Sequence, residues 1–138
     1  DYVVGLVDGE GSFTVYVWNP AKQSMRKRRV KAEPKFYIKL VEKDKEILYE
    51  LQKFFGCGNV YFQRDVRKNH QDCFRFEVGK REDLEKVIIP FFQKHQLRFP
   101  SKRRDFELFC DLFFRIKNEE HRTEEGMRRL FRIKQQMH

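Results

Sequence analysis

One stretch decides the fold of this chain, Gly5-Leu6-Val7-Asp8-Gly9-Glu10-Gly11-Ser12-Phe13. Gly11 suits a helix stop, and residues 12–18 then alternate between apolar and polar in the manner of a half-buried strand. Asp8 and Glu10 therefore lie in the last turn of a helix, where the negative end of the macrodipole disfavours each carboxylate by roughly 0.3 to 1 kcal/mol. A hard divalent cation would remove that penalty, because it binds carboxylate and carbonyl oxygens together. The stretch predicts a metal site at a helix-to-strand junction.

The same stretch also presents a stripe of small residues. Gly5 and Gly9 lie four residues apart, so on a helix they share one face against which a second backbone can pack closely. The alternative is an ordinary glycine-rich helix end with incidental acids. The two interpretations differ in whether a partner helix exists.

Size and composition indicate one domain spanning residues 1–138. Fifteen phenylalanines supply an ample core, and no apolar run approaches the ~20 residues that cross a membrane, so we expect a soluble protein without a membrane partner. A helix starting at Asp1 would be short before Gly9, so we expect further residues to precede it. Three cysteines without CxxC spacing favour core packing in a reducing compartment over disulfides or zinc.

The net charge of +9 is concentrated in two clusters. Two separate clusters favour binding to a polyanion, although a charged run is also common on an ordinary solvated face. The first cluster comprises Lys22, Arg26, Lys27, Arg28, Arg29, Lys31, Lys35 and Lys39, and the second comprises Lys94, Arg98, Lys102, Arg103 and Arg104.

Periodicity and turn signals predict the order of the elements. Strands are expected at residues 12–18, about 30–41, 59–64 and 73–78. Helices are expected at residues 1–9, after a cap at Asp44 until Gly56, at 81–89, briefly after Pro90, from Ser101, and after a cap at Thr123. This is an α+β fold with the order αββαββα. We expect a four-stranded antiparallel sheet covered by helices on one face.

The other face of the sheet is predicted to be open and to contact DNA. Its mixture of cations, amides and aromatic rings can read base edges in a major groove, which is wide enough for β-strands. The alternative is an ordinary solvated face. The predicted DNA-binding residues are Thr14, Tyr16, Trp18, Lys35, Tyr37, Lys39, Tyr61, Gln63 and Arg75, with Arg28 from the basic segment.

The opening stretch resembles the signature of the LAGLIDADG homing endonucleases, with Val3-Val4 in place of the usual Leu-Ala. Further pieces look like landmarks of that family: Val41-Glu42-Lys43-Asp44, Phe54-Phe55-Gly56-Cys57-Gly58, Ile89-Pro90-Phe91-Phe92 and Thr123-Glu124-Glu125-Gly126-Met127. Because the motif occurs once, the chain resembles the homodimeric members of the family. The resemblance places Gly5, Leu6 and Gly9 at the dimer interface.

The resemblance also implies a reaction, phosphodiester hydrolysis with Mg²⁺ or another divalent cation such as Mn²⁺. Glu10 aligns with the acid that binds the metal, the Gly9 carbonyl is the second ligand, and Asp8 is assigned to hydrogen bonding at the helix end. Lys102 is the expected basic residue of the late helix, with Arg103 and Arg98 as alternatives. Glu42 stands where the family pattern suggests Gln. A carboxylate there adds to metal binding or acts as a base, or else it weakens the approach of phosphate or marks a loss of activity.

The implied function is that of an intron-encoded homing endonuclease. It would make a double-strand break in DNA at a long pseudo-palindromic site. We expect it inside cells, in a mitochondrion, a chloroplast or a prokaryotic cytoplasm. The alternatives are a group I intron maturase that binds intron RNA, a DNA-binding regulator on the same fold, and a plain basic RNA-binding domain. The last leaves the paired acids and the glycine stripe unexplained.

Overall fold

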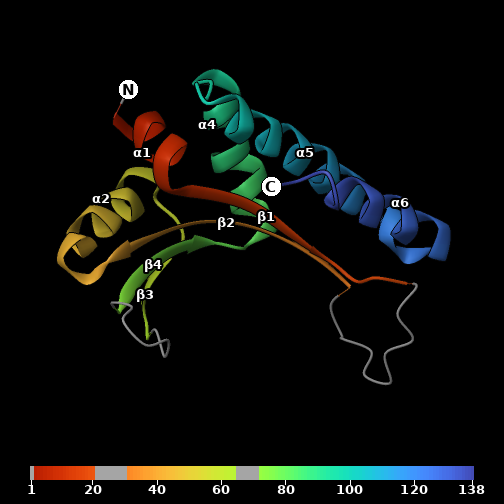
Figure 1. Cartoon of the computed structure of the whole chain (residues 1–138), viewed down its shortest axis with the longest axis horizontal. Coiled ribbons are helices and arrows are strands. Elements are labelled where there is room, and N and C mark those ends of the chain that lie inside the picture. Colours follow the sequence, from red (N-terminus) through yellow and green to blue (C-terminus); the bar gives the residue numbers. More distant parts are fainter. Residues whose placement is uncertain (1, 21–30, 65–71) are drawn as a thin grey trace. The chain divides into compact units, whose positions relative to one another are not determined.

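The computed structural model describes residues 2–20, 31–64 and 72–138. Four strands, β1 (Gly11–Val17), β2 (Ala32–Val41), β3 (Asn59–Gln63) and β4 (Cys73–Val78), form one sheet in the order β1-β2-β4-β3 (Figure 1). The chain divides into two compact units, which are described separately. Unit 1 comprises residues 1–12 and 35–99, and unit 2 comprises residues 13–34 and 100–138. The predicted order αββαββα is confirmed.

Unit 1 packs helices against one face of an antiparallel sheet. Its helices are α1 (Tyr2–Glu10), α2 (Lys45–Phe55), α3 (Arg81–Asp83) and α4 (Ile89–Lys94). Alternation along β2 buries Phe36 and Ile38 completely. The Phe36 ring lies 6.5 Å from the Phe55 ring of α2 and 5.7 Å from the Phe92 ring of α4, measured between centroids. Both helices therefore cover the same apolar face (Figure 1).

The two ends of α2 form by different means. Its C-terminus follows the prediction, because Gly56 takes a left-handed φ of 71° and its N–H donates to the Gln52 carbonyl. The expected cap by Asp44 is wrong. Asp44 occupies the N-cap position, but its side chain makes no capping hydrogen bond, and a 3₁₀ turn, η1 (Glu42–Asp44), leads into the helix instead.

The helical segment from Arg81 to Lys94 is interrupted by one π-helical turn, η2 (Leu84–Ile88). Pro90 lies in the first turn of α4, as predicted, and lacks the N–H that an uninterrupted helix would need there. The wider turn accommodates that missing bond. The predicted two helices are thus joined without a loop.

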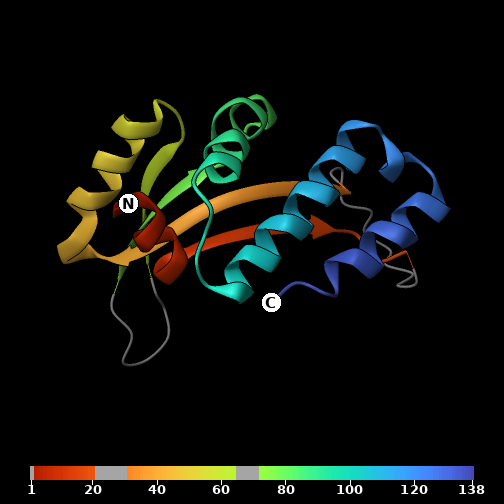
Figure 2. The same cartoon turned by 90° about the horizontal axis from the view of Figure 1, so that it is seen from above.

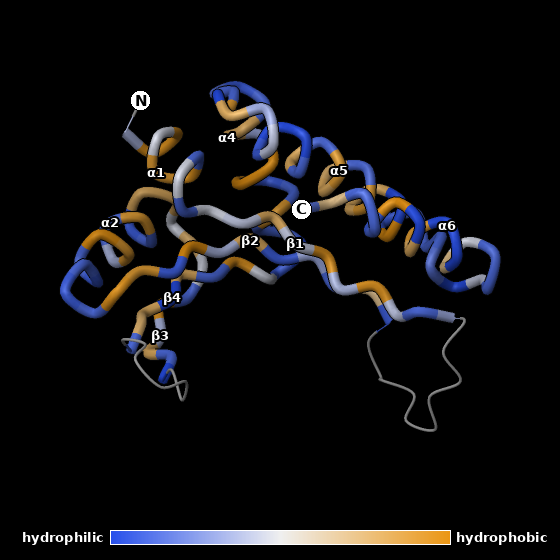
Figure 3. Tube along the Cα trace, in the orientation of Figure 1, coloured by the Kyte–Doolittle hydropathy of each residue, from blue (hydrophilic) through white to orange (hydrophobic). Residues whose placement is uncertain are grey.

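Unit 2 is built on β1 and two long helices, α5 (Pro100–Lys117) and α6 (Glu124–Lys134). The Phe13 ring of β1 lies 5.1 Å from Phe106 and 5.5 Å from Phe109, so α5 covers that strand. The short helix η3 (Glu120–Arg122) connects α5 to α6, and the two long helices lie side by side (Figure 2). Thr123 caps α6 as predicted, since its hydroxyl accepts from the Gly126 N–H at 3.0 Å. Hydrophobic and hydrophilic residues alternate along α2 and α6 (Figure 3).

Three details of the predicted elements are wrong. Apolar residues at helical spacing predict that Phe54 and Phe114 belong to the buried stripes of their helices, but they are 55% and 38% exposed. Each lies next to a buried phenylalanine, Phe55 or Phe113. Successive residues of a helix point about 100° apart, so only one of each pair can face the core. In addition, β1 ends at Val17, one residue before Trp18.

Candidate active site and nucleic-acid interface

The two acids at the end of α1 have opposite environments. Asp8 is only 5% exposed, whereas Glu10 is exposed. Two residues of a helix separate side chains by about 200°, which turns one carboxylate inward and the other outward. The Asp8 carboxylate accepts hydrogen bonds from the backbone N–H groups of Arg98 at 3.0 Å and Phe99 at 3.2 Å. The predicted hydrogen bonding of Asp8 exists, but its donors lie 90 residues away and not at the end of α1 itself.

The exposed Glu10 is the acid that remains available to a cation. In the described part of the chain, no group of three or more His, Cys, Asp or Glu side chains could hold a metal ion. A cation at Glu10 would therefore take further ligands from the Gly9 carbonyl, water and oxygens outside this chain. Mg²⁺ is often bound in this way, through one or two carboxylates together with substrate phosphates. The donor set fits a hard cation in a site completed by a partner or a substrate.

The outer face of α1 is bare. Tyr2 is 64% exposed, and a Cβ added at Gly5 or Gly9 would meet no atom within 4 Å. Gly11 differs, because a Cβ there would approach the Val7 side chain at 2.6 Å. The fold of this chain requires glycine at residue 11 but not at 5 or 9. The predicted interface of Gly5, Leu6 and Gly9 stays a prediction, and the half-buried Leu6 lies beside the open stripe.

The other predicted catalytic residues lie in separate units. Glu42 is exposed in the 3₁₀ turn after β2, in unit 1. Lys102 is half-buried in the first turn of α5, in unit 2, and Arg103 beside it is exposed. Arg98 belongs to the segment that Asp8 holds in unit 1, and its side chain is exposed.

The polar face of the sheet in unit 1 carries a connected group around Arg75. Its guanidinium carbon lies 3.6 Å from the centroid of the Tyr37 ring, and Nη2 contacts Glu77 Oε1 at 3.0 Å. The Tyr61 hydroxyl donates to the same Oε1 at 3.2 Å. Burial, followed by the nearby Glu77 carboxylate, raises the pKa of Tyr61 against the opposing effect of Arg75. We call Tyr37, Tyr61, Arg75 and Glu77 the Arg75 cluster.

Comparison with known proteins places this arrangement in a family. A family model described as LAGLIDADG endonuclease matches residues 3–113. The chain belongs to the LAGLIDADG endonuclease family. Probable intron-encoded endonuclease 3 of Neurospora crassa is 34% identical over 137 residues, covering 96% of this chain and 23% of that protein. Probable intron-encoded DNA endonuclease 1 of Mycosarcoma maydis is 33% identical over 108 residues, covering 78% of this chain and 34% of that protein.

Solved LAGLIDADG-type structures show the same fold. The homing endonuclease I-TnaI is 37% identical with a TM-score of 0.78, over 99% of this chain and 86% of that chain. The homing endonuclease I-GzeII, in complex with its DNA target, is 28% identical with a TM-score of 0.79, over 99% of this chain and 43% of that chain. I-SmaMI, bound to uncleaved DNA in the presence of calcium ions, is 29% identical with a TM-score of 0.77. The chain thus spans about a quarter to a third of the curated relatives described above.

The strand register of this LAGLIDADG chain explains which predicted DNA-binding residues come together. Arg75 stands opposite both Lys39 and Tyr61, and Tyr37 stands opposite Glu77. Lys35 Nζ lies 3.9 Å from Glu77 Oε2, and Gln63 pairs with Cys73. Sequence reasoning missed Glu77. Its position two residues after Arg75 on the same strand was the available signal, because such residues share a face.

The remaining predicted DNA-binding residues lie in unit 2 or outside the described residues. Thr14 receives a hydrogen bond from Lys134 of α6 at 3.4 Å, and Tyr16 is half-buried on the same side of β1. Trp18 follows the end of β1, so the alternation of that strand does not fix its direction. Arg28 lies outside the described residues.

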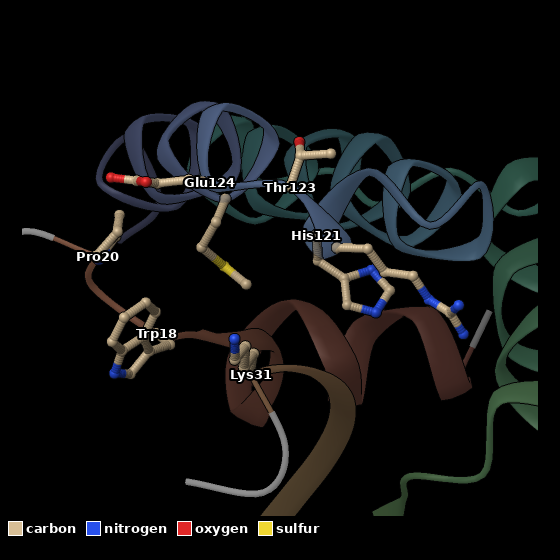
Figure 4. A pocket seen from close by; sticks show the side chains of 8 residues that line it. Trp18, Pro20, Lys31, His121, Thr123 and Glu124 are labelled. Carbon is tan, nitrogen blue, oxygen red and sulfur yellow. The ribbon is translucent and has the colours of Figure 1, made fainter. Parts of the chain in front are cut away.

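Trp18 lines a pocket within unit 2 of about 310 Å³. The Lys31 ammonium lies 5.4 Å from the centroid of the indole ring, and the backbone N–H of Trp18 donates to the backbone carbonyl of Lys31 at 2.8 Å. Figure 4 shows Trp18, Pro20 and Lys31 opposite His121, Thr123 and Glu124 of the η3 and α6 region. Trp18 therefore faces the start of α6. None of the helices in the described residues is both long and apolar enough to span a membrane.

Proposed function

We propose that this chain forms a site-specific DNA endonuclease that makes a metal-dependent double-strand break. The observation that carries the proposal is the separation of the two acids at the end of α1, with Asp8 buried and hydrogen-bonded and Glu10 exposed beside an open glycine face. The likeness to the homing endonuclease I-TnaI, and to I-GzeII in complex with its DNA target, supports it. The names of the curated relatives support an intron-encoded origin.

The proposed partner of α1 is a second copy of the chain. The bare face containing Gly5 and Gly9 allows two helices to approach closely, and a twofold pair would bring two Glu10 carboxylates to one place. Like charges brought together repel each other unless a cation lies between them. The chain spans 86% of I-TnaI, so a homing endonuclease chain of similar length exists. A twofold dimer would select a pseudo-palindromic DNA site.

Each predicted site residue has a separate role in the proposed phosphodiester hydrolysis. Glu10 and the Gly9 carbonyl would hold Mg²⁺ or Mn²⁺, and the bound cation supplies charge stabilisation at the phosphodiester. Lys102 would balance the charge that develops on the phosphate oxygens, with Arg103 or Arg98 as the alternative. Glu42 would accept a proton from the attacking water or add a carboxylate ligand. The buried Asp8 would take no direct part, because backbone N–H groups already occupy its oxygens.

A cleavage assay on plasmid libraries with randomised sites tests the proposal. The wild-type protein should cut in Mg²⁺ and stop when EDTA is added. Glu10→Gln should lower the cleavage rate about 10³-fold or more while DNA binding stays within a few-fold. Glu46→Gln, which neutralises an exposed acid on α2, is the matched control and should cut normally. Normal cleavage by Glu10→Gln would contradict the proposal. RNA binding that promotes splicing, without DNA cleavage, would favour the maturase instead.

Binding should also weaken steeply with salt. Each phosphate that a Lys or Arg neutralises releases counterions, so the logarithm of affinity falls linearly with the logarithm of salt concentration. Titrations between 50 and 200 mM salt, about the range in which such contacts lose most affinity, measure the slope. A flat slope would contradict a phosphate-binding role for the +9 net charge.

A further inference from the structure

An acidic residue lies at the centre of the proposed DNA-binding face. Glu77 makes contacts with three different side chains: Arg75 at 3.0 Å, the Tyr61 hydroxyl at 3.2 Å and Lys35 at 3.9 Å. Its own side chain is 21% exposed and that of Arg75 is 19% exposed. A carboxylate on a surface that binds phosphate weakens binding of all sequences equally unless it has a specific task. The organisation around Glu77 points to such a task.

The two oxygens of Glu77 are used unequally. Oε1 accepts from the Tyr61 hydroxyl and forms an ion pair with Arg75 Nη2, whereas Oε2 faces the Lys35 ammonium at 3.9 Å, beyond hydrogen-bonding distance. Oε2 therefore keeps the capacity to accept a hydrogen bond from a ligand. Arg75 retains donors in the same way, because a guanidinium has five N–H groups and the ion pair with Glu77 is made through Nη2. Its Nε is buried without a hydrogen-bond partner among the described residues.

The Arg75 guanidinium is also held in place before any ligand arrives. It stacks on the Tyr37 ring at 3.6 Å, and the ion pair with Glu77 limits its rotation. The Tyr61 hydroxyl fixes the carboxylate from the neighbouring strand. The cluster thus presents a planar set of donors and an adjacent acceptor in one fixed geometry. Such preorganisation favours selective binding, because little side-chain freedom is lost on contact.

We propose that Arg75 and Glu77 together recognise one G·C base pair in the DNA bound by each copy of the chain. In the major groove, a G·C pair presents the guanine N7 and O6 acceptors next to the cytosine N4 donor. Arg75 donates to the two guanine acceptors, and Glu77 Oε2 accepts from cytosine N4. An A·T pair alternates acceptor, donor and acceptor, so it offers no adjacent pair of acceptors to a guanidinium fork. This inference rests on the proposed DNA-binding function and adds a base preference to it.

A binding selection from randomised DNA tests the inference. The selection is done in calcium to separate binding from cleavage, with wild type, Glu77→Gln, Arg75→Lys and Glu82→Gln. Wild type should prefer G·C at one position for each bound copy by roughly 10- to 100-fold. Glu77→Gln and Arg75→Lys should lose most of that preference and keep the rest of the selected sequence. Glu82→Gln removes the same charge from exposed α3 and should select like wild type.

The outcomes separate the two proposals. A selected sequence that both cluster variants leave unchanged would overturn the base-pair assignment and leave the endonuclease proposal intact. A wild-type sequence without a required G·C pair would overturn it equally. Failure of the wild type to select any sequence would overturn the proposed function and this inference together. Circular dichroism of each variant checks folding, and Arg75→Lys serves if Glu77→Gln does not fold.

Discussion

Glu77 in unit 1 and Glu120 in unit 2 have similar burial and similar neighbours, yet they differ in what they leave available. Their side chains are 21% and 18% exposed. Both oxygens of Glu120 accept from Arg115 at 3.1 Å, and Arg129 donates to one of them at 2.9 Å. Glu77 uses Oε1 for one hydrogen bond and one ion pair, and its Oε2 lies 3.9 Å from the Lys35 ammonium, beyond hydrogen-bonding distance. A carboxylate beside arginines therefore has a structural role, here called a structural tie, when both of its oxygens accept hydrogen bonds within the protein. It is a candidate ligand-binding group when one oxygen does not.

The two units also differ in the close contact that holds two segments of the chain together. In unit 2, the missing side chain of Gly126 allows α6 to pack directly against the backbone of Glu120. In unit 1, the buried Asp8 carboxylate accepts hydrogen bonds from the backbone N–H groups of Arg98 and Phe99. Both contacts involve a buried residue and backbone atoms, so solvent screens them less than it screens ion pairs on the surface. They should therefore give the largest effects on stability, and the exposed ion pairs should give the smallest.

The largest expected effect comes from Gly126→Ala. An added Cβ would lie 1.8 Å from the Glu120 carbonyl oxygen and 2.8 Å from Thr123 Oγ1, so the backbone of η3 must shift. The free energy of unfolding should fall by about 3 kcal/mol. Burial raises the pKa of the Cys110 thiol on α5 to about 12, so its labelling at pH 8 reports opening of unit 2.

The control for Gly126→Ala is Gly79→Ala, where the added Cβ meets its nearest atom, on the Lys35 side chain, at 3.8 Å. This variant should label at Cys110 like wild type and unfold at the same denaturant concentration. Equal stability of the two variants would show that the backbone of η3 can shift without lowering the free energy of unfolding. The stability of unit 2 would then not depend on the close approach at Gly126.

Asp8→Asn should have the next largest effect. The amide can turn only one oxygen toward the N–H groups of Arg98 and Phe99, and its NH₂ group then opposes a donor. We expect a loss of about 2 kcal/mol in the free energy of unfolding, measured by urea denaturation. Glu10→Gln neutralises the exposed acid two residues away and should change stability by less than about 0.5 kcal/mol. Equal losses in both variants would contradict the distinction between the two acids.

Much of the fold could be predicted because its signals are local. Strand alternation, Gly56 after α2 and the Thr123 cap each depend on a few neighbouring residues, and each is present in the structure. The errors arose where a choice depends on distant packing. Phe113 and Phe114 are equally apolar, and only the direction of α5 decides that the first is buried.

The candidate site was predictable in its residue types but not in its connections. The motif indicates two acids, yet the partners of Asp8 lie 90 residues along the chain, and no sequence spacing reveals such a contact. Glu77 is absent from the predicted DNA-binding residues because that prediction selects cations, amides and aromatic rings on the open face. Only the register Tyr37–Glu77 and Tyr61–Arg75 shows that the acid lies among the predicted readers.

Glu120→Gln tests the structural tie directly. The variant weakens the contacts with Arg115 and Arg129, whose side chains are 37% and 40% exposed. Because solvent screens exposed pairs, the free energy of unfolding should fall by only about 1 kcal/mol, and by less in high salt. Denaturation at two salt concentrations measures this change. The selected DNA sequence should stay as in wild type, and an altered base preference would remove the contrast with Glu77.

Glu77→Gln should have the smallest effect on stability, because the amide oxygen can still accept from the Tyr61 hydroxyl, and the ion pair that is lost is partly exposed. We expect a change below about 0.5 kcal/mol at neutral pH. The measurable effect of Glu77→Gln is a change in the pKa of Tyr61. Burial first, and then the charge and hydrogen bond of Glu77, raise the pKa of Tyr61 above 10.0, against the opposing charge of Arg75.

A raised pKa in the folded state contributes stability that is present below pH 10.0 and is lost as the pH rises through the folded value. Glutamine removes the negative charge at residue 77 and leaves a weaker, uncharged acceptor for the Tyr61 hydroxyl, so the pKa of Tyr61 should fall in Glu77→Gln. The alkaline loss of stability should become shallower. The ultraviolet absorbance of tyrosinate during titration, compared between wild type and variant, measures the shift. An unchanged titration would mean that Glu77 does not hold Tyr61 in solution, and the fixed geometry inferred for the Arg75 cluster would then be wrong.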